Sequence, residues 1–292
     1  MARASDQAAG LRRLLAVPAC RVVTLLSAVE PDERDTLVIN LAASLAHFGQ
    51  SVVLMDGSNA QGRIAKRLGV RSQCTLMDVA ADACTLASAI HSPMKGLGFI
   101  DMSRDQRIRG AEKRLEMAVE QLTSHCDVLL VTTELNAEHR LPIEALASGD
   151  LVVQVSRRRN AITSGYGAIK GLSRLTGRRS FGVLVTGTPE NEARTLYANM
   201  AEVASRFLAI SLDFVGSIPH DDFASRACEL RRPVIEAFPL AEASTALRRI
   251  AEAIVQTADR RVGDTQEAES TPGSRTSSEN RTFHVHDHGQ GR

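Results

Sequence analysis

The chain has 292 residues, and 43% of them are hydrophobic, which is enough for a core of one large α/β domain or two smaller ones. Its 35 Lys and Arg balance 34 Asp and Glu to a net charge of +1, which excludes strong nonspecific attraction to nucleic acid or anionic membranes. The first twenty residues carry Arg3, Asp6, Arg12 and Arg13, so they do not match a signal peptide, and we expect a cytoplasmic protein.

Short apolar segments recur along the chain, mostly separated by stretches with helical spacing. They cover residues 21–26, 97–102, 127–132, 150–155, 181–186 and 212–218. Continuous rather than alternating hydrophobicity is typical of strands buried on both faces of a parallel sheet. The pattern predicts an α/β fold with a doubly wound, mostly parallel sheet flanked by helices.

The first strand is followed by an unusual connection. Residues 21–26 predict a strand and residues 36–49 a helix ending at Gly49, with residues 27–36 as a loop between them. A phosphate-binding P-loop at this place needs glycines, a Lys and a Ser or Thr. No glycine occurs from residue 11 to 48, Pro31 lacks an N–H, and Arg34 is the single cation among four carboxylates. We therefore expect no ATP binding here.

Residues 27–42, SAVEPDERDTLVINLA, nevertheless resemble the P-loop of the ParA/MinD-type ATPases, and of their flagellar-number regulators, the FlhG/FleN/YlxH group. An ungapped comparison with the family pattern SGKGGVGKTNIAANLA matches Ser27, Asn40, Leu41 and Ala42. Val29 stands at the signature lysine, Arg34 at the phosphate-binding lysine, and Asp35 at the Mg²⁺-binding Thr or Ser. The resemblance implies a P-loop frame without its chemistry.

Two further nucleotide motifs of that family are also incomplete. Residues 51–70 resemble its first switch, with Asp56 at the first Asp and Ser58 replacing the second. Residues 126–172 resemble the second switch, with Thr132 and Asn136 where relatives have an Asp and a Gly-containing loop. The family uses ATP and Mg²⁺, and we expect both cofactors to be lost, with no catalytic residues and no metal site.

The C-terminal third keeps the family pattern over residues 181–254. Ile218, Pro219 and Asp221 match an IPxD turn, and Arg232, Pro233 and Val234 a basic-Pro-Val step. Each short pattern taken alone is expected to close the sheet rather than bind a ligand. Residues 247–258 then form an apolar helix face, which we expect to pack on its own core; weak membrane contact, as in MinD-type relatives, is the alternative.

The N-terminal segment, residues 5–16, resembles the DQAxxLR motif of flagellar-number regulators. In that family the motif binds and stimulates FlhF, a GTPase of the signal-recognition-particle type. The resemblance implies partner binding through Asp6, Gln7, Leu11 and Arg12. The alternative is a helix packed on its own domain.

The cysteines and histidines predict no metal site. Cys20, Cys74, Cys84, Cys126 and Cys228 lack metal-ligand spacing, and small reduced thiols are the favoured interpretation over a metal or disulfide framework. From residue 263 the sequence is polar and predicts a disordered tail, in which His284, His286 and His288 could hold a metal only weakly.

The sequence thus predicts three parts: a partner-binding helix over 1–17, a MinD-like domain over 18–261 and a tail over 262–292. We expect a non-catalytic regulator of flagellar number or placement, with an FlhF-type GTPase and flagellar basal-body components as partners and no specific nucleic acid. It would be cytoplasmic, with the inner membrane or flagellated pole as peripheral locations. The alternatives are an active ATPase in which Arg34 holds nucleotide, and a ParA-like protein that positions DNA or a secretion complex.

Overall fold

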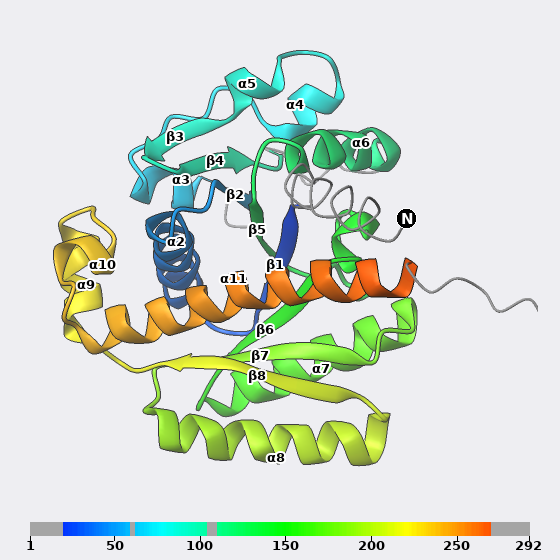
Figure 1. Ribbon diagram of the computed structural model, residues 1–292, viewed down its shortest axis with the longest axis vertical. Coiled ribbons are helices and arrows are strands. Elements are labelled where there is room, and N and C mark those ends of the chain that lie inside the picture. The colour runs from blue at the N-terminus through cyan, green and yellow to red at the C-terminus, as the bar shows by residue number, and fades with distance from the viewer. Residues whose placement is uncertain (1–19, 59–61, 104–109, 270–292) are drawn as a thin grey trace, which may run out of the picture.

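A twisted sheet of eight strands forms the centre of the described part of the molecule (Figure 1). The computed structural model describes residues 20–58, 62–103 and 110–269, the last thirteen of these by their backbone alone. The strand order is β3-β4-β2-β5-β1-β6-β7-β8. The strands are β1 Arg21–Ser27, β2 Val52–Gly57, β3 His91–Met94, β4 Leu97–Asp101, β5 Val128–Thr133, β6 Asp150–Ser156, β7 Ser180–Thr186 and β8 Ser211–Ile218.

The predicted doubly wound, mostly parallel sheet is confirmed. Strands β4, β2, β5, β1, β6, β7 and β8 pair in parallel, as expected for runs buried on both faces. The edge strand β3 pairs antiparallel with β4 and was not predicted. Its sequence, HSPM, has no apolar run, and Pro93 is tolerated because an edge strand needs fewer ladder hydrogen bonds.

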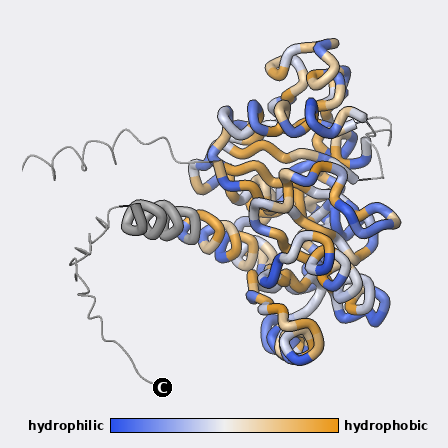
Figure 2. The backbone as a smooth tube through the Cα atoms, turned by 90° about the vertical axis from the view of Figure 1, so that its right-hand side faces the viewer, coloured by the Kyte–Doolittle hydropathy of each residue, from blue (hydrophilic) through white to orange (hydrophobic). Residues whose placement is uncertain are grey.

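Helices cover both faces of the sheet and create two hydrophobic cores. Helices α2, α10 and α11 pack together on one face, whereas α4 and α6, α7 and α8 cover the other. Figure 2 shows the central strands as the most hydrophobic part of the chain. The helices are α2 Pro31–His47, α3 Arg63–Arg67, α4 Leu76–Ala80, α5 Leu86–Ala89, α6 Glu112–Thr123, the 3₁₀ helix η1 Glu144–Ala147, α7 Arg159–Thr176, α8 Glu190–Leu208, α9 Asp222–Glu229, α10 Val234–Ala237 and α11 Glu242–Glu269.

The helix after β1 starts earlier than predicted. Helix α2 begins at Pro31 rather than residue 36, so most of the expected loop over 27–36 is helical. Proline at the first helical position has a fixed φ that suits a helix, and Asp32 and Glu33 in the first turn favour the positive end of the helix dipole. The same acidic residues that predicted a loop hostile to phosphate are thus good helix starters. The other end agrees with prediction: Gly49, just after the cap residue Phe48, has φ +83°.

The terminal helix α11 packs on its own domain, as favoured from the sequence. Leu247, Ile250 and Ile254 are buried, and the helix contacts α2 and β8. Those residues are therefore unavailable for the alternative, membrane contact. The helix continues to Glu269, so the expected boundary at residue 262 falls inside it. The rest of the tail and the N-terminal segment lie outside the described residues, and no described helix is long and apolar enough to cross a membrane.

Candidate functional site

The candidate site lies where β1 and β6 end and their connections part. From β1 the chain passes through α2 to β2 on one side, whereas β6 continues through α7 to β7 on the other. In doubly wound sheets such a divergence leaves a crevice at the carboxyl ends of the strands, where ligands bind. The sequence-predicted residues Ser27, Val29, Arg34, Asp35 and Asp56 all come from this edge of the sheet.

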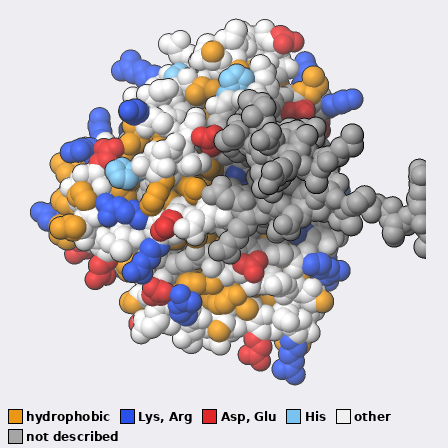
Figure 3. All heavy atoms as spheres, viewed as in Figure 1, with side chains coloured by type: hydrophobic (Ala, Val, Ile, Leu, Met, Phe, Trp, Pro, Cys, Tyr) orange, Lys and Arg blue, Asp and Glu red, His pale blue; other side chains and the backbone are white. Residues whose placement is uncertain are grey.

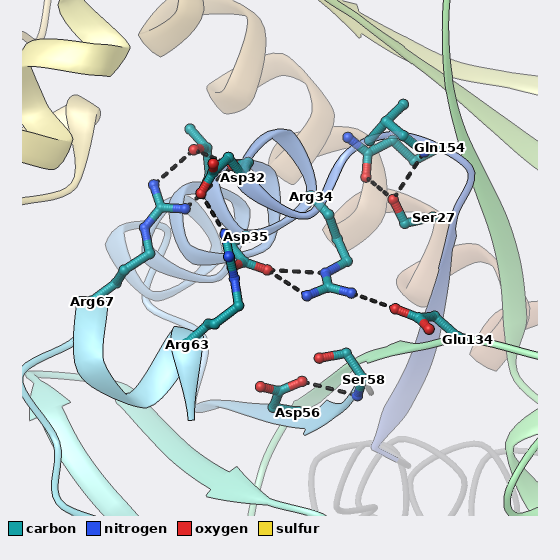
Figure 4. Close-up of polar contacts among 12 residues, drawn as sticks. Ser27, Asp32, Arg34, Asp35, Asp56, Ser58, Arg63, Arg67, Glu134 and Gln154 are labelled. Carbon is teal, nitrogen blue, oxygen red and sulfur yellow. Dashed lines mark hydrogen bonds and ion pairs between the residues drawn. The ribbon is translucent and has the colours of Figure 1, made fainter. Parts of the chain in front are cut away.

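The connection from β1 to α2 consists of Ala28, Val29 and Glu30 alone. The Ala28 N–H donates to the Gln154 carbonyl at 3.0 Å, and the Ser27 hydroxyl donates to Gln154 Oε1 at 3.1 Å (Figure 4). A phosphate cradle needs successive N–H groups turned toward one point. Here the segment is bound to β6 and enters the helix at once, and Val29 is half-buried with no charge to offer.

Arg34 is buried, with 2% of its side chain exposed, and is held by carboxylates of the protein itself. Its Nε and Nη2 donate to Asp35 Oδ1 at 2.9 and 2.8 Å, and its Nη1 donates to Glu134 Oε1 at 2.7 Å. Each nitrogen of the guanidinium therefore contacts an anion already present in the chain. Glu134, just after β5, was not predicted as part of the site.

Asp35 and the first turn of α2 are clamped from the other side by helix α3. Asp35 is fully buried, and its Oδ2 accepts from Arg63 Nε at 2.9 Å. Arg63 also pairs with Asp32, and Arg67, one turn further along α3, donates to Thr36 Oγ1 at 2.8 Å. Figure 4 shows the arginines of α3 facing the start of α2. These arginines were also missed, although their spacing of four residues on a helix indicates a common face.

Asp56, at the end of β2, is buried with one oxygen unpartnered. Its Oδ1 accepts from the Ser58 N–H at 3.0 Å, while its Oδ2 has no hydrogen-bond partner among the described residues. Burial raises the pKa of Asp56 to about 6, with Asp101 adding to the effect and Ser58 and Arg34 opposing it. Thr132, its neighbour in register on β5, also has a buried hydroxyl without a partner in the described chain.

A cleft of about 750 Å³ opens beside this network, between α2, the ends of β6, β7 and β8, and α9. Its lining is of mixed charge: Asp32 and Glu33 come from α2, and Arg157 and Arg158 follow β6. Glu33 accepts a hydrogen bond from the Thr186 hydroxyl at the end of β7. The helix terminus that faces the cleft thus presents carboxylates where an anion would approach. Mixed charge is also the pattern on the face shown in Figure 3.

The IPxD turn and the basic-Pro-Val step both make hydrogen bonds that connect helices of the fold. Asp221 accepts from the Phe223 N–H at 2.8 Å, capping α9, and its second oxygen accepts from the Ala243 N–H at 2.9 Å at the start of α11. Val234, at the start of α10, donates its N–H to Asn40 Oδ1 at 2.7 Å and so connects α10 to α2. These contacts support the expectation that the short patterns close the fold.

The structure places some of the predicted residues close together, places Asn136 elsewhere, and does not describe the predicted partner-binding residues. Arg34 and Asp35 form one ion pair, and Asp56 lies near enough for the Arg34 charge to act on it. Asn136 instead accepts from the N–H groups of Glu138 and Arg140 in an exposed turn. The predicted partner-binding residues, Asp6, Gln7, Leu11 and Arg12, lie outside the described residues. Within the described chain, no three His, Cys, Asp or Glu side chains could hold a metal ion.

Comparison with known proteins finds relatives in sequence and in structure. The antiactivator FleN of Pseudomonas aeruginosa is 28% identical over 228 residues, which cover 76% of this chain and 81% of FleN. MinD in a MinC:MinD cell division complex of Aquifex aeolicus superposes with a TM-score of 0.61 at 20% identity, covering 88% of this chain and all of that one. The chain has the fold of the MinD/ParA proteins and is similar in sequence to FleN.

Other matches agree on the MinD/ParA fold. MinD of Pyrococcus horikoshii, solved with Mg-ADP, superposes with a TM-score of 0.60 at 17% identity, covering 82% of this chain and 97% of that one. No family model matches the chain. Val29, Arg34 and Asp35 stand where the resembled family pattern has two lysines and a Mg²⁺ ligand, and Arg34 and Asp35 are ion-paired to each other.

Proposed function

We propose that this protein regulates flagellar number or placement by binding other proteins, without hydrolysing ATP. The similarity to the antiactivator FleN, over three quarters of the chain, supports the flagellar role. The site geometry supports the non-catalytic role, because a MinD-type hydrolase needs a phosphate cradle, free lysines and a metal ligand. At those places this chain has a helix start, an engaged arginine and an ion-paired aspartate.

The environment of Arg34 carries the proposal. A buried guanidinium contacting Asp35 and Glu134 has its charge neutralised inside the protein. To bind a phosphate it would have to leave one carboxylate behind, buried and without its cation, which costs several kcal/mol. Asp35 would also have to break its hydrogen bond with Arg63 in order to coordinate Mg²⁺. The residues present therefore do not fit a magnesium nucleotide, and we infer that none is bound.

Calorimetry of the full chain with Mg-ATP tests this proposal. We expect no heat of binding at micromolar ligand and no phosphate release above that of a buffer control. A related MinD/ParA-type ATPase with an intact P-loop serves as the positive control in the same buffer. A dissociation constant below about 10 µM, roughly −7 kcal/mol of binding free energy, would show that the site still works.

The proposed partner is an FlhF-type GTPase, bound through residues 5–16. The DQAxxLR resemblance supports this, and docking alone suffices to position catalytic groups of a GTPase in trans. The chain should raise GTP hydrolysis by its cognate FlhF, and the double variant Asp6→Ala, Gln7→Ala should not. Matched stability of both proteins is the control. If the double variant still stimulates the GTPase, this segment is not the contact; flagellar counts in a cell lacking residues 5–16 test the role independently.

A second candidate is a ParA-like protein that still binds nucleotide and positions another cargo, such as DNA or a secretion complex. The cleft of about 750 Å³ beside α2 and the unpartnered Asp56 Oδ2 favour it, since both leave room for a polar ligand. The same calorimetry distinguishes the two candidates. Binding of Mg-ATP, together with full function after deletion of residues 5–16, would support this one.

A further inference from the structure

Two cysteines meet at the amino-terminal ends of β1 and β5, whereas the candidate site lies at the carboxyl-terminal ends of the strands. Cys20 immediately precedes β1, and Cys126 lies two residues before β5. The Arg21 N–H donates to the Asp127 carbonyl at 2.8 Å, which aligns the two chain segments. As a result the sulfur atoms of Cys20 and Cys126 lie 3.5 Å apart, although 106 positions separate them in the sequence. The sequence favoured small reduced thiols over a disulfide framework and gave no sign of this contact.

The pair lies at the edge of the core and borders a groove. Cys126 belongs to the hydrophobic core, and Cys20 packs against it while remaining half-buried. Both line a groove of about 1020 Å³ together with His125 and Asp127. A small oxidant in solution can therefore reach the sulfur atoms, whereas the neighbouring apolar side chains keep them in place.

The two thiols differ in acidity. The hydrogen bond from Cys126 lowers the pKa of Cys20, because it stabilises the Cys20 thiolate. The pKa of Cys126 is raised by the same contact and by burial. Cys20 is the more exposed of the two thiols and so the one that an oxidant meets first, and Cys126, 3.5 Å away, is placed to resolve its oxidised form.

We propose that Cys20 and Cys126 are a redox pair that closes to a disulfide when hydrogen peroxide oxidises the protein. The Cys20 thiolate attacks peroxide, giving Cys20 sulfenic acid and hydroxide. The Cys126 thiol then attacks the sulfenic sulfur, forming the S–S bond and releasing water. In total, one peroxide is reduced to two waters and two thiols are oxidised to one disulfide. The chemistry does not depend on the flagellar role proposed above.

The disulfide would fix the point at which residues 1–19 join the domain. Cys20 is the link between residues 1–19 and β1, and a covalent bond to Cys126 would fix that link against the start of β5. Disulfides that form in reducing compartments are usually transient and either catalytic or redox-sensing.

The test separates this pair from the other cysteines. Cys74 and Cys84 are also close enough for Cys74 to act on the pKa of Cys84, and Cys228 is exposed. The full chain with Cys74→Ser, Cys84→Ser and Cys228→Ser retains Cys20 and Cys126 alone. We expect peroxide to remove both remaining thiols, with a mass loss of two hydrogens that dithiothreitol reverses. Peptide mapping of the unmutated chain should join the peptides that hold Cys20 and Cys126.

Two matched variants complete the design. With Cys126→Ser added, Cys20 should stop at the sulfenic acid, which dimedone traps; with Cys20→Ser added, neither product should form. Circular dichroism verifies that each variant folds, and mapping of the unmutated chain needs no variant. An unchanged mass, a link to a different cysteine, or a dimer joined between chains on a non-reducing gel would overturn the proposal.

Discussion

Arg34 Nη1 donates to Glu134 Oε1 at 2.7 Å near the carboxyl ends of the strands, although 100 positions separate the two residues in the sequence. Arg34 stands where the resembled ParA/MinD pattern has a phosphate-binding lysine, and Glu134 comes directly after β5. The chain therefore supplies its own anion at this point. The Arg34–Glu134 pair, together with Asp35 and Arg63, forms a network of ion pairs that connects the end of β5 with α2 and α3.

Removing Arg34 should destabilise the fold. Arg34→Ala leaves Asp35, which is fully buried, without its nearest cation, and breaking such a buried pair costs about 3–5 kcal/mol. Arg63 still contacts Asp35, so we expect the lower end of that range. Urea denaturation measures the loss. The control is Arg157→Ala, which removes an exposed pair with Glu192 and should cost less than about 1 kcal/mol. Equal losses would show that the buried network contributes no more than a surface pair.

Restoring the family residues at two positions should not restore nucleotide binding. Arg34→Lys with Asp35→Thr returns the side chains of the phosphate and Mg²⁺ slots. Pro31 and the helical residues after it still provide no inward-facing series of N–H groups, and Glu33 still faces the cleft. Calorimetry with Mg-ATP should give no heat, provided that circular dichroism shows a folded variant. Micromolar binding of Mg-ATP by this variant would mean that the side chains at positions 34 and 35, rather than the missing glycines, prevent nucleotide binding in the unmutated chain.

The sheet could be predicted from the sequence, whereas the network at its edge could not. The apolar runs at 127–132 and 150–155 specify strands β5 and β6 through composition alone, because burial on both faces leaves few choices of residue. The start of α2 was misjudged because Asp32 and Glu33 suit both a loop and a first helical turn. The contact of Arg34 with Glu134 depends on how β5 and α2 meet in space, which no local pattern encodes. Strand β3 lacks any apolar signal.

Asp56 should make stability depend on pH in the acidic range. Its pKa is about 6 in the folded chain, against an ordinary value of 3.8. The folded chain therefore binds this proton more tightly than the unfolded chain does. The contribution is fully present below about pH 4 and is lost as the pH rises through about 6, and a pKa difference of this size corresponds to about 3 kcal/mol.

Asp56→Asn, which is neutral at every pH, isolates this effect. Unfolding free energies of both proteins, measured by urea denaturation at steps between pH 4 and pH 7, give the difference between them. Relative to the unmutated chain, we expect the Asn variant to gain up to about 3 kcal/mol over that interval. The exposed Glu202→Gln serves as the control. A flat difference for Asp56→Asn would mean that folding does not raise the pKa of Asp56.

Asp221 should act in stability through its two backbone contacts, which join β8, α9 and α11. Asp221→Ala removes the acceptor for the N–H groups of Phe223 and Ala243, and loss of an N-cap alone costs about 1 kcal/mol. With the second contact, we expect about 2 kcal/mol in urea denaturation. The neighbouring Asp222, with 93% of its side chain exposed, offers the matched control Asp222→Ala, which should change stability by less than about 0.5 kcal/mol. If the two variants were equally stable, these hydrogen bonds would not hold the turn, and the mixed-charge cleft that Asp221 lines would become the place to look for its role.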